Sequence, residues 1–494
     1  MAKKVIIIGA GLGGISAAIS LAAEGFSVEV YEKNNNLGGK LNILKKEGFG
    51  FDLGPSIFTL PHLFDRLFQR ANKRLVDYVP LQTVSPHWRN IFEDGTVIDL
   101  FKDDRKMKDE LDKLGPDNYS AFQKFKSYSK KQYDIVEKGY FNKGLDTTWE
   151  ILKHYSWLDL FLRLDILRTM DQGVRRFFKD PYLVDIFNFF IKYVGSSALH
   201  APAFFNLMPH IQFGYDLWYV KGGMYNLALG LKKLMDELKI KTFYNSEVVK
   251  IKKSGNRVTG VVLVGGETKH ADVIVSNMEV IPAYRRLLEE ENNFLKGLDK
   301  FEPACSGLVL HLGVNKIYSK LAHHNFFYSK NQSKHFKTVF EKKMLPEDPT
   351  IYVVAPTRSD PEQAPEGCDN IKVLPHIPYI NEESPLSRED YSAFREKIIS
   401  KLERMGLENL RRHIIVEDMW TPLDIQQHYY SHKGAIYGVV SDKKKNLGFK
   451  APKKSSRYAN LYFVGGSVNP GGGMPMVILC GQNVCDSIMK HDLS

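Results

Sequence analysis

The first forty residues of the chain contain the pattern that most constrains its fold. Residues 5–8 are Val-Ile-Ile-Ile, typical of a strand buried on both faces, and residues 15–23 are small and apolar, as in a packed helix. The turn between them carries the candidate binding residues Gly9, Gly11, Leu12, Gly13 and Gly14. In such a turn the first glycine permits the bend, the second lets a pyrophosphate approach, and the last allows close helix–strand packing. The pattern predicts a dinucleotide site at the helix N-terminus.

A second predicted strand, residues 27–31, strengthens this interpretation because it ends on an acid. Glu32 follows Gly14 by eighteen residues, close to the spacing expected in a dinucleotide-binding unit. A carboxylate there can accept both hydroxyls of an adenosine ribose and would repel a ribose 2′-phosphate. The sequence therefore favours NAD or FAD over NADP, and it disfavours the alternative of a chance glycine pattern in an ordinary loop.

The C-terminal part of the sequence contains a second pattern of strand, glycine turn and helix. Residues 460–464 are predicted to form a strand that enters a second glycine turn, and residues 477–489 are predicted to form a helix. The candidate binding residues of this turn are Gly465, Gly466, Gly472, Gly473 and Met474. Glycines let backbone amides approach a ligand at a helix N-terminus, although a purely structural turn is an alternative. We expect both ends of the chain to meet on one cofactor.

Charge and cysteine content narrow the choice of partners and compartment. A net charge of +11 implies an anionic partner, but the lysines are dispersed and no nucleic-acid recognition motif is present. We therefore expect no nucleic-acid binding, and a solvated surface or contact with an anionic membrane instead. The four cysteines form no CxxC pair, which predicts free thiols and no metal site. We expect a cytoplasmic protein that is peripheral on the inner face of the cell membrane.

The predicted fold class is α/β, with a discontinuous Rossmann-like dinucleotide-binding domain and a mixed α+β substrate domain. The dinucleotide-binding domain is predicted to comprise residues 1–75, 216–305 and 441–494. Residues 76–215 are predicted to be a helical substrate part whose bulky apolar side chains and cations fit either buried helices or membrane-associating segments. Residues 306–440 are predicted to supply the sheet and helices of the substrate domain, covering the cofactor.

Together these stretches resemble the carotenoid desaturase and oxygenase family of FAD proteins. The resemblance spans nearly the whole chain and rests on residues 9–14, 32–34, 38–40, 51–56, 222–224 and 461–475. It implies FAD rather than NAD, which makes the dinucleotide-binding domain an FAD-binding domain, with Glu32 at the adenosine ribose and Lys40 near the phosphates or ribitol. It also implies that Lys33, Gly39, Gly54, Pro55, Ser56, Val248 and Val249 contact the cofactor, the two valines near the adenine. Lys40 stands where many relatives have Arg, which loses a bidentate fork but keeps the charge.

The resemblance implies an activity, in which the oxygenase branch is preferred. The terminal methyl group of a C30 carotenoid would be oxidised to an aldehyde, and reduced flavin would pass its electrons to oxygen or a membrane quinone. The alternatives are a carotenoid desaturase, a flavin amine oxidase and a non-catalytic prenyl-lipid carrier. No side chain stands out as catalytic; the polar candidates in the substrate domain are His200, His210, His376 and Trp420.

Overall fold

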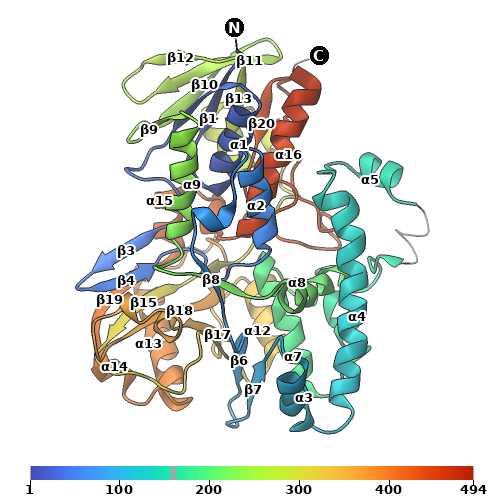
Figure 1. Cartoon of the computed structure of the whole chain (residues 1–494), viewed down its shortest axis with the longest axis vertical. Coiled ribbons are helices and arrows are strands. Elements are labelled where there is room, and N and C mark those ends of the chain that lie inside the picture. The colour runs from blue at the N-terminus through green and yellow to red at the C-terminus, as the bar shows by residue number, and fades with distance from the viewer. Residues whose placement is uncertain (1, 157–162, 493–494) are drawn as a thin grey trace.

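A computed structural model describes residues 2–156 and 163–492 of the chain (Figure 1). In the upper part of Figure 1 lies a five-stranded sheet whose neighbouring strands are all parallel. In order across the sheet the strands are β20 (Leu461–Phe463), β13 (Val273–Ser276), β1 (Lys4–Ile8), β2 (Ser27–Tyr31) and β9 (Lys241–Phe243). Segments far apart in the sequence therefore share one sheet, and the predicted α/β class with a discontinuous Rossmann-like unit is confirmed.

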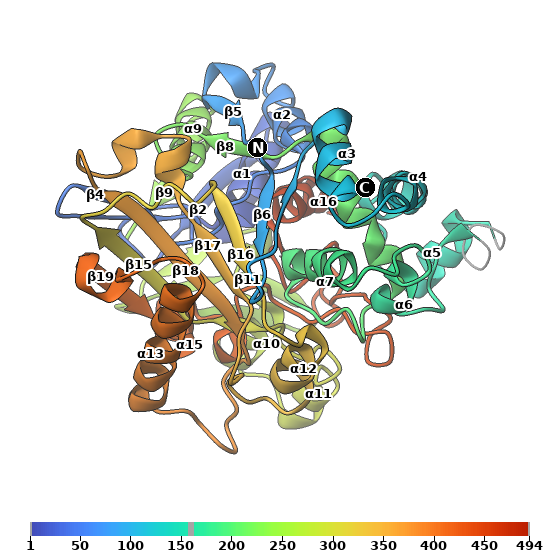
Figure 2. The same ribbon diagram turned by 90° about the horizontal axis from the view of Figure 1, so that it is seen from below.

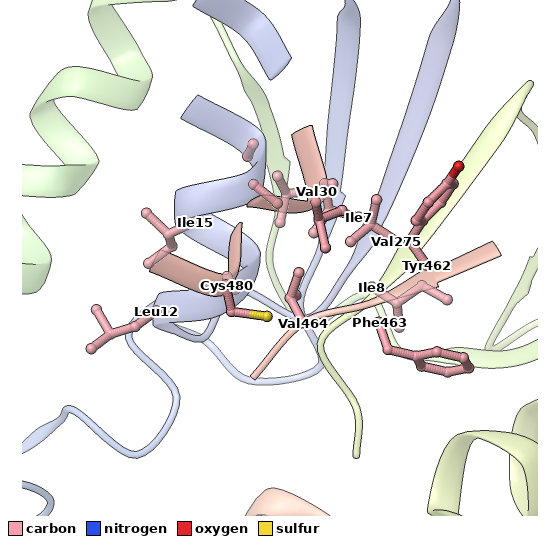
Figure 3. Close-up of a cluster of buried hydrophobic side chains, with 14 of the residues drawn as sticks. Ile7, Ile8, Leu12, Ile15, Val30, Val275, Tyr462, Phe463, Val464 and Cys480 are labelled. Carbon is pink, nitrogen blue, oxygen red and sulfur yellow. The ribbon is translucent and has the colours of Figure 1, made fainter. Parts of the chain in front are cut away.

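The two ends of the chain are joined by helices that pack side by side. Helix α1 (Leu12–Ala23) and helix α16 (Met474–Asp492) lie against each other and against the parallel sheet. Their approach is close, because a Cβ atom added to Gly481 would lie 2.6 Å from the backbone nitrogen of Ala17. Ser16 Oγ also donates a hydrogen bond of 2.5 Å to the carbonyl of Ile478. Figure 3 shows side chains of both helices meeting those of the sheet in one apolar core.

A second, mixed sheet covers the carboxyl ends of the parallel strands. Its order is β19 (Ile414–Trp420), β15 (Val309–Val314), β18 (Asp369–Ile377), β17 (Ile351–Val354), β16 (His324–Phe327), β6 (Trp88–Ile91) and β7 (Val97–Leu100), with β14 (Ser306–Gly307) beside β18. One face packs against helix α13 (Arg388–Arg404), and Figure 2 shows that helix lying along the sheet. Residues of the opposite face, such as Tyr352 and Phe326, belong to the aromatic core of the helical part.

The helical part is built around α4 (Asn118–Val136) and α7 (Pro181–Phe189). Phe125 of α4 contacts Phe187 of α7 edge to face, with ring centroids 4.9 Å apart. Further helices here are α3 (Asp104–Asp112), α5 (Thr148–His154), α6 (Met170–Val174), the 3₁₀ helix η4 (Phe190–Val194) and α8 (Met208–Tyr215). The bulky apolar residues expected within 76–215 include the stretch 157–167, of which residues 157–162 lie outside the described residues. No helix in the described ranges is both long and apolar enough to cross a membrane.

The predicted domain ranges stay predictions, although the range 76–215 holds strands as well as helices. Residues 88–91 and 97–100 form a hairpin through the turn at Asp94 and Gly95, and β6 then adds to the substrate sheet beside β16. The remaining strands and α-helices in the described ranges are β3 (Ile43–Lys46), β4 (Phe49–Asp52), α2 (Pro61–Gln69), β5 (Leu81–Thr83), β8 (Trp218–Val220), α9 (Asn226–Glu237), β10 (Val248–Ser254), β11 (Arg257–Leu263), β12 (Thr268–His270), α10 (Val280–Pro282), α11 (Asn292–Lys296), α12 (Gln332–Phe336), α14 (Leu410–His413) and α15 (Pro422–Tyr429).

Candidate functional site

A cavity of about 330 Å³ lies where the carboxyl ends of the parallel strands meet the second sheet. This is the edge at which open α/β sheets bind ligands. Most of the predicted cofactor residues line it: Gly9, Gly11, Leu12, Gly13, Glu32, Lys33, Gly39, Lys40, Gly54, Pro55, Val248, Gly465, Gly466, Gly472, Gly473 and Met474. The fold thus brings both glycine turns and the acid at the end of β2 to one cavity.

Three predicted residues do not line the cavity. A Cβ atom at Gly14 would lie 2.2 Å from the carbonyl oxygen of Gly9, so this glycine serves the contact between α1 and β1. Ser56 is buried and lies 3.3 Å from Lys372 Nζ, whereas the Val249 side chain is 40% exposed on β10. The cofactor-binding roles of all the predicted residues, these three included, stay predictions.

The carboxylate of Glu32 is held in place by backbone amides. The amide of Ala10 donates to Oε2 at 2.7 Å, and the amide of Asn34 donates to Oε1 at 2.9 Å. Glu32 is buried at the cavity wall directly after β2. A carboxylate oxygen can accept more than one hydrogen bond, so the group can still receive the two hydroxyls of a ribose. This arrangement fits the adenosine half of a dinucleotide.

Two lysines, Lys33 and Lys40, also line the cavity. Lys33 Nζ lies 4.0 Å from the ring centroid of Tyr430, and the Tyr430 hydroxyl donates to Glu247 at 2.9 Å. Burial lowers the pKa of Lys33. Lys40 Nζ donates to the carbonyls of Ala435 and Ile436 at 3.1 and 3.2 Å. Lys40 therefore links the segment after β2 to the loop before the C-terminal turn, from a position inside the cavity wall.

Asn277 is a cavity residue that the sequence analysis did not single out. Its Oδ1 accepts the amide of Gly14 at 3.0 Å, and its Nδ2 donates to the carbonyl of Val464 at 3.2 Å. The side chain thus fastens the N-terminal glycine turn to the end of β20. The sequence does contain a signal for this residue, because Asn277 directly follows the buried strand β13, just as Glu32 follows β2.

The opposite wall comes from the second sheet and is mostly apolar. Leu374 and the buried Lys372 line it from β18 and Trp420 from β19, and Tyr437 adds to it from the loop after the 3₁₀ helix η10 (His432–Gly434). Lys372 Nζ donates to the carbonyl of Gly54. Burial lowers the pKa of Lys372 to about 8, although the nearby Asp52 carboxylate opposes that shift. Such a wall suits a flat ring system and a hydrocarbon better than a charged substrate.

The four polar candidates separate in space. Trp420 lines the cavity, and His376 lies behind Tyr437, with its Nε2 3.4 Å from the tyrosine hydroxyl. His200 instead lies 3.2 Å from Glu341, and His210 packs on the ring of Tyr133. In the described ranges, no three His, Cys, Asp or Glu side chains are grouped so that they could hold a metal ion.

The sequence matches known families and proteins over nearly its whole length. Residues 12–489 match the family model of flavin containing amine oxidoreductases. The chain is 58% identical to a 4,4′-diapolycopene oxygenase from Methylomonas sp., covering 99% of this chain and 98% of the relative. It is 52% identical to a 4,4′-diaponeurosporene oxygenase from Staphylococcus haemolyticus, covering 98% of this chain and 97% of that protein.

Solved structures share the fold at low sequence identity. A putrescine oxidase variant superposes with a TM-score of 0.65 at 16% identity, covering 99% of both chains. Cyclohexylamine oxidase from Brevibacterium oxydans superposes with a TM-score of 0.62 at 14% identity, covering all of both chains. The dinucleotide cradle, the family match and the full-length relatives agree on a flavin enzyme. The chain belongs to the flavin containing amine oxidoreductase family, in the branch that includes the 4,4′-diapolycopene and 4,4′-diaponeurosporene oxygenases.

Proposed function

We propose that the chain binds FAD and oxidises the terminal methyl group of a C30 carotenoid, 4,4′-diaponeurosporene or 4,4′-diapolycopene, to the aldehyde. One observation carries this proposal: the dinucleotide cradle opens onto an apolar wall that includes Leu374, Trp420 and Tyr437. The oxygenase names of the relatives at 58% and 52% identity supply the substrate class.

The chain's own residues bind and orient in this proposal. Glu32 receives the adenosine ribose, the amides of the two glycine turns face the pyrophosphate, and the apolar wall positions the polyene. When bound, the flavin supplies a two-electron acceptor for hydride removed from the carbon next to the conjugated system. The added oxygen atom comes from water or dioxygen, and a second two-electron oxidation converts the resulting alcohol to the aldehyde. The wall keeps other water away from that carbon, and the close approach of substrate and ring is the main contribution expected of the protein.

The experiment is incubation of the purified protein with FAD and liposomes that contain 4,4′-diaponeurosporene, followed by mass spectrometry of the pigment. Oxygenation adds one oxygen atom and removes two hydrogens at the chain end. A desaturase would instead remove hydrogen without adding oxygen and would lengthen the chromophore. An unchanged pigment under conditions where FAD is bound would count against catalysis and favour a carrier.

For the electron acceptor we infer oxygen or a membrane quinone. The glycine turn with its acid at the end of β2 occurs once in the sequence, and no second complete unit is available for a pyridine nucleotide. Mixing the FAD-loaded protein with NADPH under anaerobic conditions should leave the flavin absorption unchanged. Rapid bleaching would overturn this inference.

We also propose that the protein is cytoplasmic and contacts the inner face of the membrane through the surface around α5. This helix projects from the helical part in Figure 1. Its Trp149 side chain is 74% exposed and Leu152 is 51% exposed, with the exposed Lys143 and Lys153 nearby in the chain. Exposed aromatic and apolar side chains flanked by cations favour an anionic bilayer surface.

Vesicle sedimentation tests this surface. The double variant Trp149→Ser, Leu152→Ser should bind anionic vesicles at least about fivefold more weakly than the wild type, because it removes the apolar anchors. Val264→Ser is the matched control, since Val264 is 62% exposed on the turn between β11 and β12. Equal loss in both variants, or no loss in the double variant, would contradict this assignment.

A further inference from the structure

Lys192, on helix η4, lies in a buried cage of aromatic rings. Its Nζ is 3.9 Å from the ring centroid of Tyr352, 4.7 Å from that of Phe326, and 5.1 Å from those of Trp88 and Tyr193. The residue is only 4% exposed. Lysines are rarely buried. A lysine amine enclosed by four aromatic rings therefore requires an explanation.

The cage adjoins the cavity along the second sheet. Trp420 pairs with Val309 across β19 and β15, and Leu374 pairs with Tyr352 across β18 and β17. Trp420, Val309 and Leu374 all line the cavity, whereas Tyr352, on the next strand, lies beneath Lys192. Lys192 therefore stands beside the edge of the cavity formed by β18.

The C-terminal turn approaches the cage from the other side. A Cβ atom added to Gly473, which lines the cavity, would lie 3.9 Å from the carbonyl oxygen of Tyr193. A Cβ atom added to Gly195 would lie 2.3 Å from the ring of Tyr437. The segment that carries Lys192 thus lies against the C-terminal turn, which is expected to face the flavin.

The amine of Lys192 has no polar partner in the part of the chain that the structure describes. Lys401 is equally buried at 3% exposure, but its Nζ donates to the carbonyls of Tyr328 and Pro349 and to Asp348. Burial without a carboxylate lowers the pKa of Lys192 well below its ordinary value, which favours a neutral amine. A neutral amine still has N–H groups that can donate hydrogen bonds, and its burial among apolar side chains costs less than that of an ammonium ion.

We propose that Lys192 Nζ binds the oxygen atom that the substrate gains at its chain end, and thereby retains the oxygenated intermediate for its conversion to the aldehyde. This inference rests on the proposed function. A hydrocarbon end has no atom that accepts a hydrogen bond from the amine, whereas an alcohol or aldehyde oxygen can accept one. The apolar wall of the cavity holds the conjugated chain, and only its oxygenated end reaches the amine between the rings. The occupied cage also disfavours an amine substrate, because the chain's own amine already fills the space between the rings.

The test is anaerobic binding of two probes, 4,4′-diaponeurosporene and its terminal aldehyde, each in detergent micelles, without turnover. The wild type should bind the aldehyde about tenfold more tightly than the hydrocarbon, the effect expected of one hydrogen bond in an apolar site. The absorption band of the bound aldehyde should also move to longer wavelength relative to micelles. Lys192→Met should bind both probes equally and lose the spectral shift, and Lys192→Gln, which keeps an N–H donor, should retain part of the preference.

The control is Lys401→Met, which should melt at a lower temperature because three partners lose their donor, yet keep the preference for the aldehyde. Lys192→Met should melt no lower than the wild type, since it removes an unpaired buried amine. A preference that survives in Lys192→Met, or a wild type that binds both probes equally without a spectral shift, would overturn the role of Lys192 alone. A wild type that binds neither probe would overturn the proposed function as well.

Discussion

At the scale of single residues, the carboxylate of Glu32 is the group that we expect to bind the adenosine ribose. Two backbone amides, from Ala10 and Asn34, hold its oxygens at the end of β2. We predict that Glu32→Ala weakens FAD binding to the apoprotein at least about tenfold, because hydrogen bonds to a charged acceptor are lost. Flavin fluorescence titration measures this. The control is Glu267→Ala, at a side chain 63% exposed on a surface turn, which should bind FAD like the wild type. Undiminished FAD binding by Glu32→Ala would contradict the role of Glu32 at the ribose.

The residues that could be predicted and those that could not differ in how local their signal is. Glu32 was identified because a short strand and a fixed spacing place it. Lys192 and Lys372 carry no such signal, since their positions beside the cavity depend on strand pairing and on a helix far away in the sequence. Asn277 lies between these cases: its place at a strand end was visible, but its bond to the end of β20 was not.

At the scale of elements, Gly14 in the first turn of α1 and Gly25 just after its end allow a matched comparison. A Cβ atom at Gly14 would meet the carbonyl oxygen of Gly9 at 2.2 Å, whereas one at Gly25 meets nothing within 4 Å. Gly25 has a φ of +86°, so an alanine there costs only about 1–2 kcal/mol of backbone strain. We predict that Gly14→Ala lowers the free energy of unfolding by about 3 kcal/mol and abolishes FAD binding, because α1 must move from β1. Urea unfolding and FAD titration of both variants check this; equal behaviour would contradict it.

The C-terminal turn gives a prediction about pH. Lys450 is buried, and its Nζ donates to the carbonyl of Val439 at 2.5 Å and to Ser441 Oγ at 2.7 Å. Its backbone amide donates to Asn469 at 2.8 Å, at the start of the turn that lines the cavity. Burial lowers the pKa of Lys450 to about 7. Between about pH 7 and pH 10 the unfolded chain therefore holds a proton that the folded chain has released, so the stability contributed by this group rises with pH.

Replacing Lys450 by Met should remove that rise. The difference in unfolding free energy between the wild type and Lys450→Met should move in favour of the wild type by about 1.4 kcal/mol per pH unit between about pH 7.5 and 9. Denaturant unfolding at several pH values measures it. Lys232→Met, at an exposed helical lysine, serves as the control and should show no such trend. A difference that is constant with pH would show that Lys450 stays charged in the folded protein.

Elements with strong periodicity were predicted closely, and those set by distant pairing were not. The strand expected at 27–31 is β2, and the helix expected at 477–489 lies within α16, Met474–Asp492. The hairpin at 88–100 was not anticipated, because β6 joins the sheet by pairing with β16 more than two hundred residues later. Local propensity does not contain that information.

At the scale of the whole molecule, segments from the two ends of the chain meet at one cavity. The glycine turn before α1 and the turn before α16 line the same cavity, and the side chain of Asn277 ties them together. A ligand that contacts both turns should therefore stabilise both at once, since binding to the folded state lowers the population of locally opened states. Neither turn alone encloses the site.

Hydrogen–deuterium exchange with and without FAD tests this coupling. We predict slower exchange on FAD addition in residues 9–14, 32–40 and 465–474 together, with no change in α13, which packs on the far face of the second sheet. In Asn277→Ala the protection of the two turns should be smaller, because the side chain that joins them is missing. Protection confined to residues 9–14 and 32–40 would mean that the C-terminal turn is structural only. The cofactor would then be held by the N-terminal unit, and Gly473 would no longer place the flavin beside the cage around Lys192.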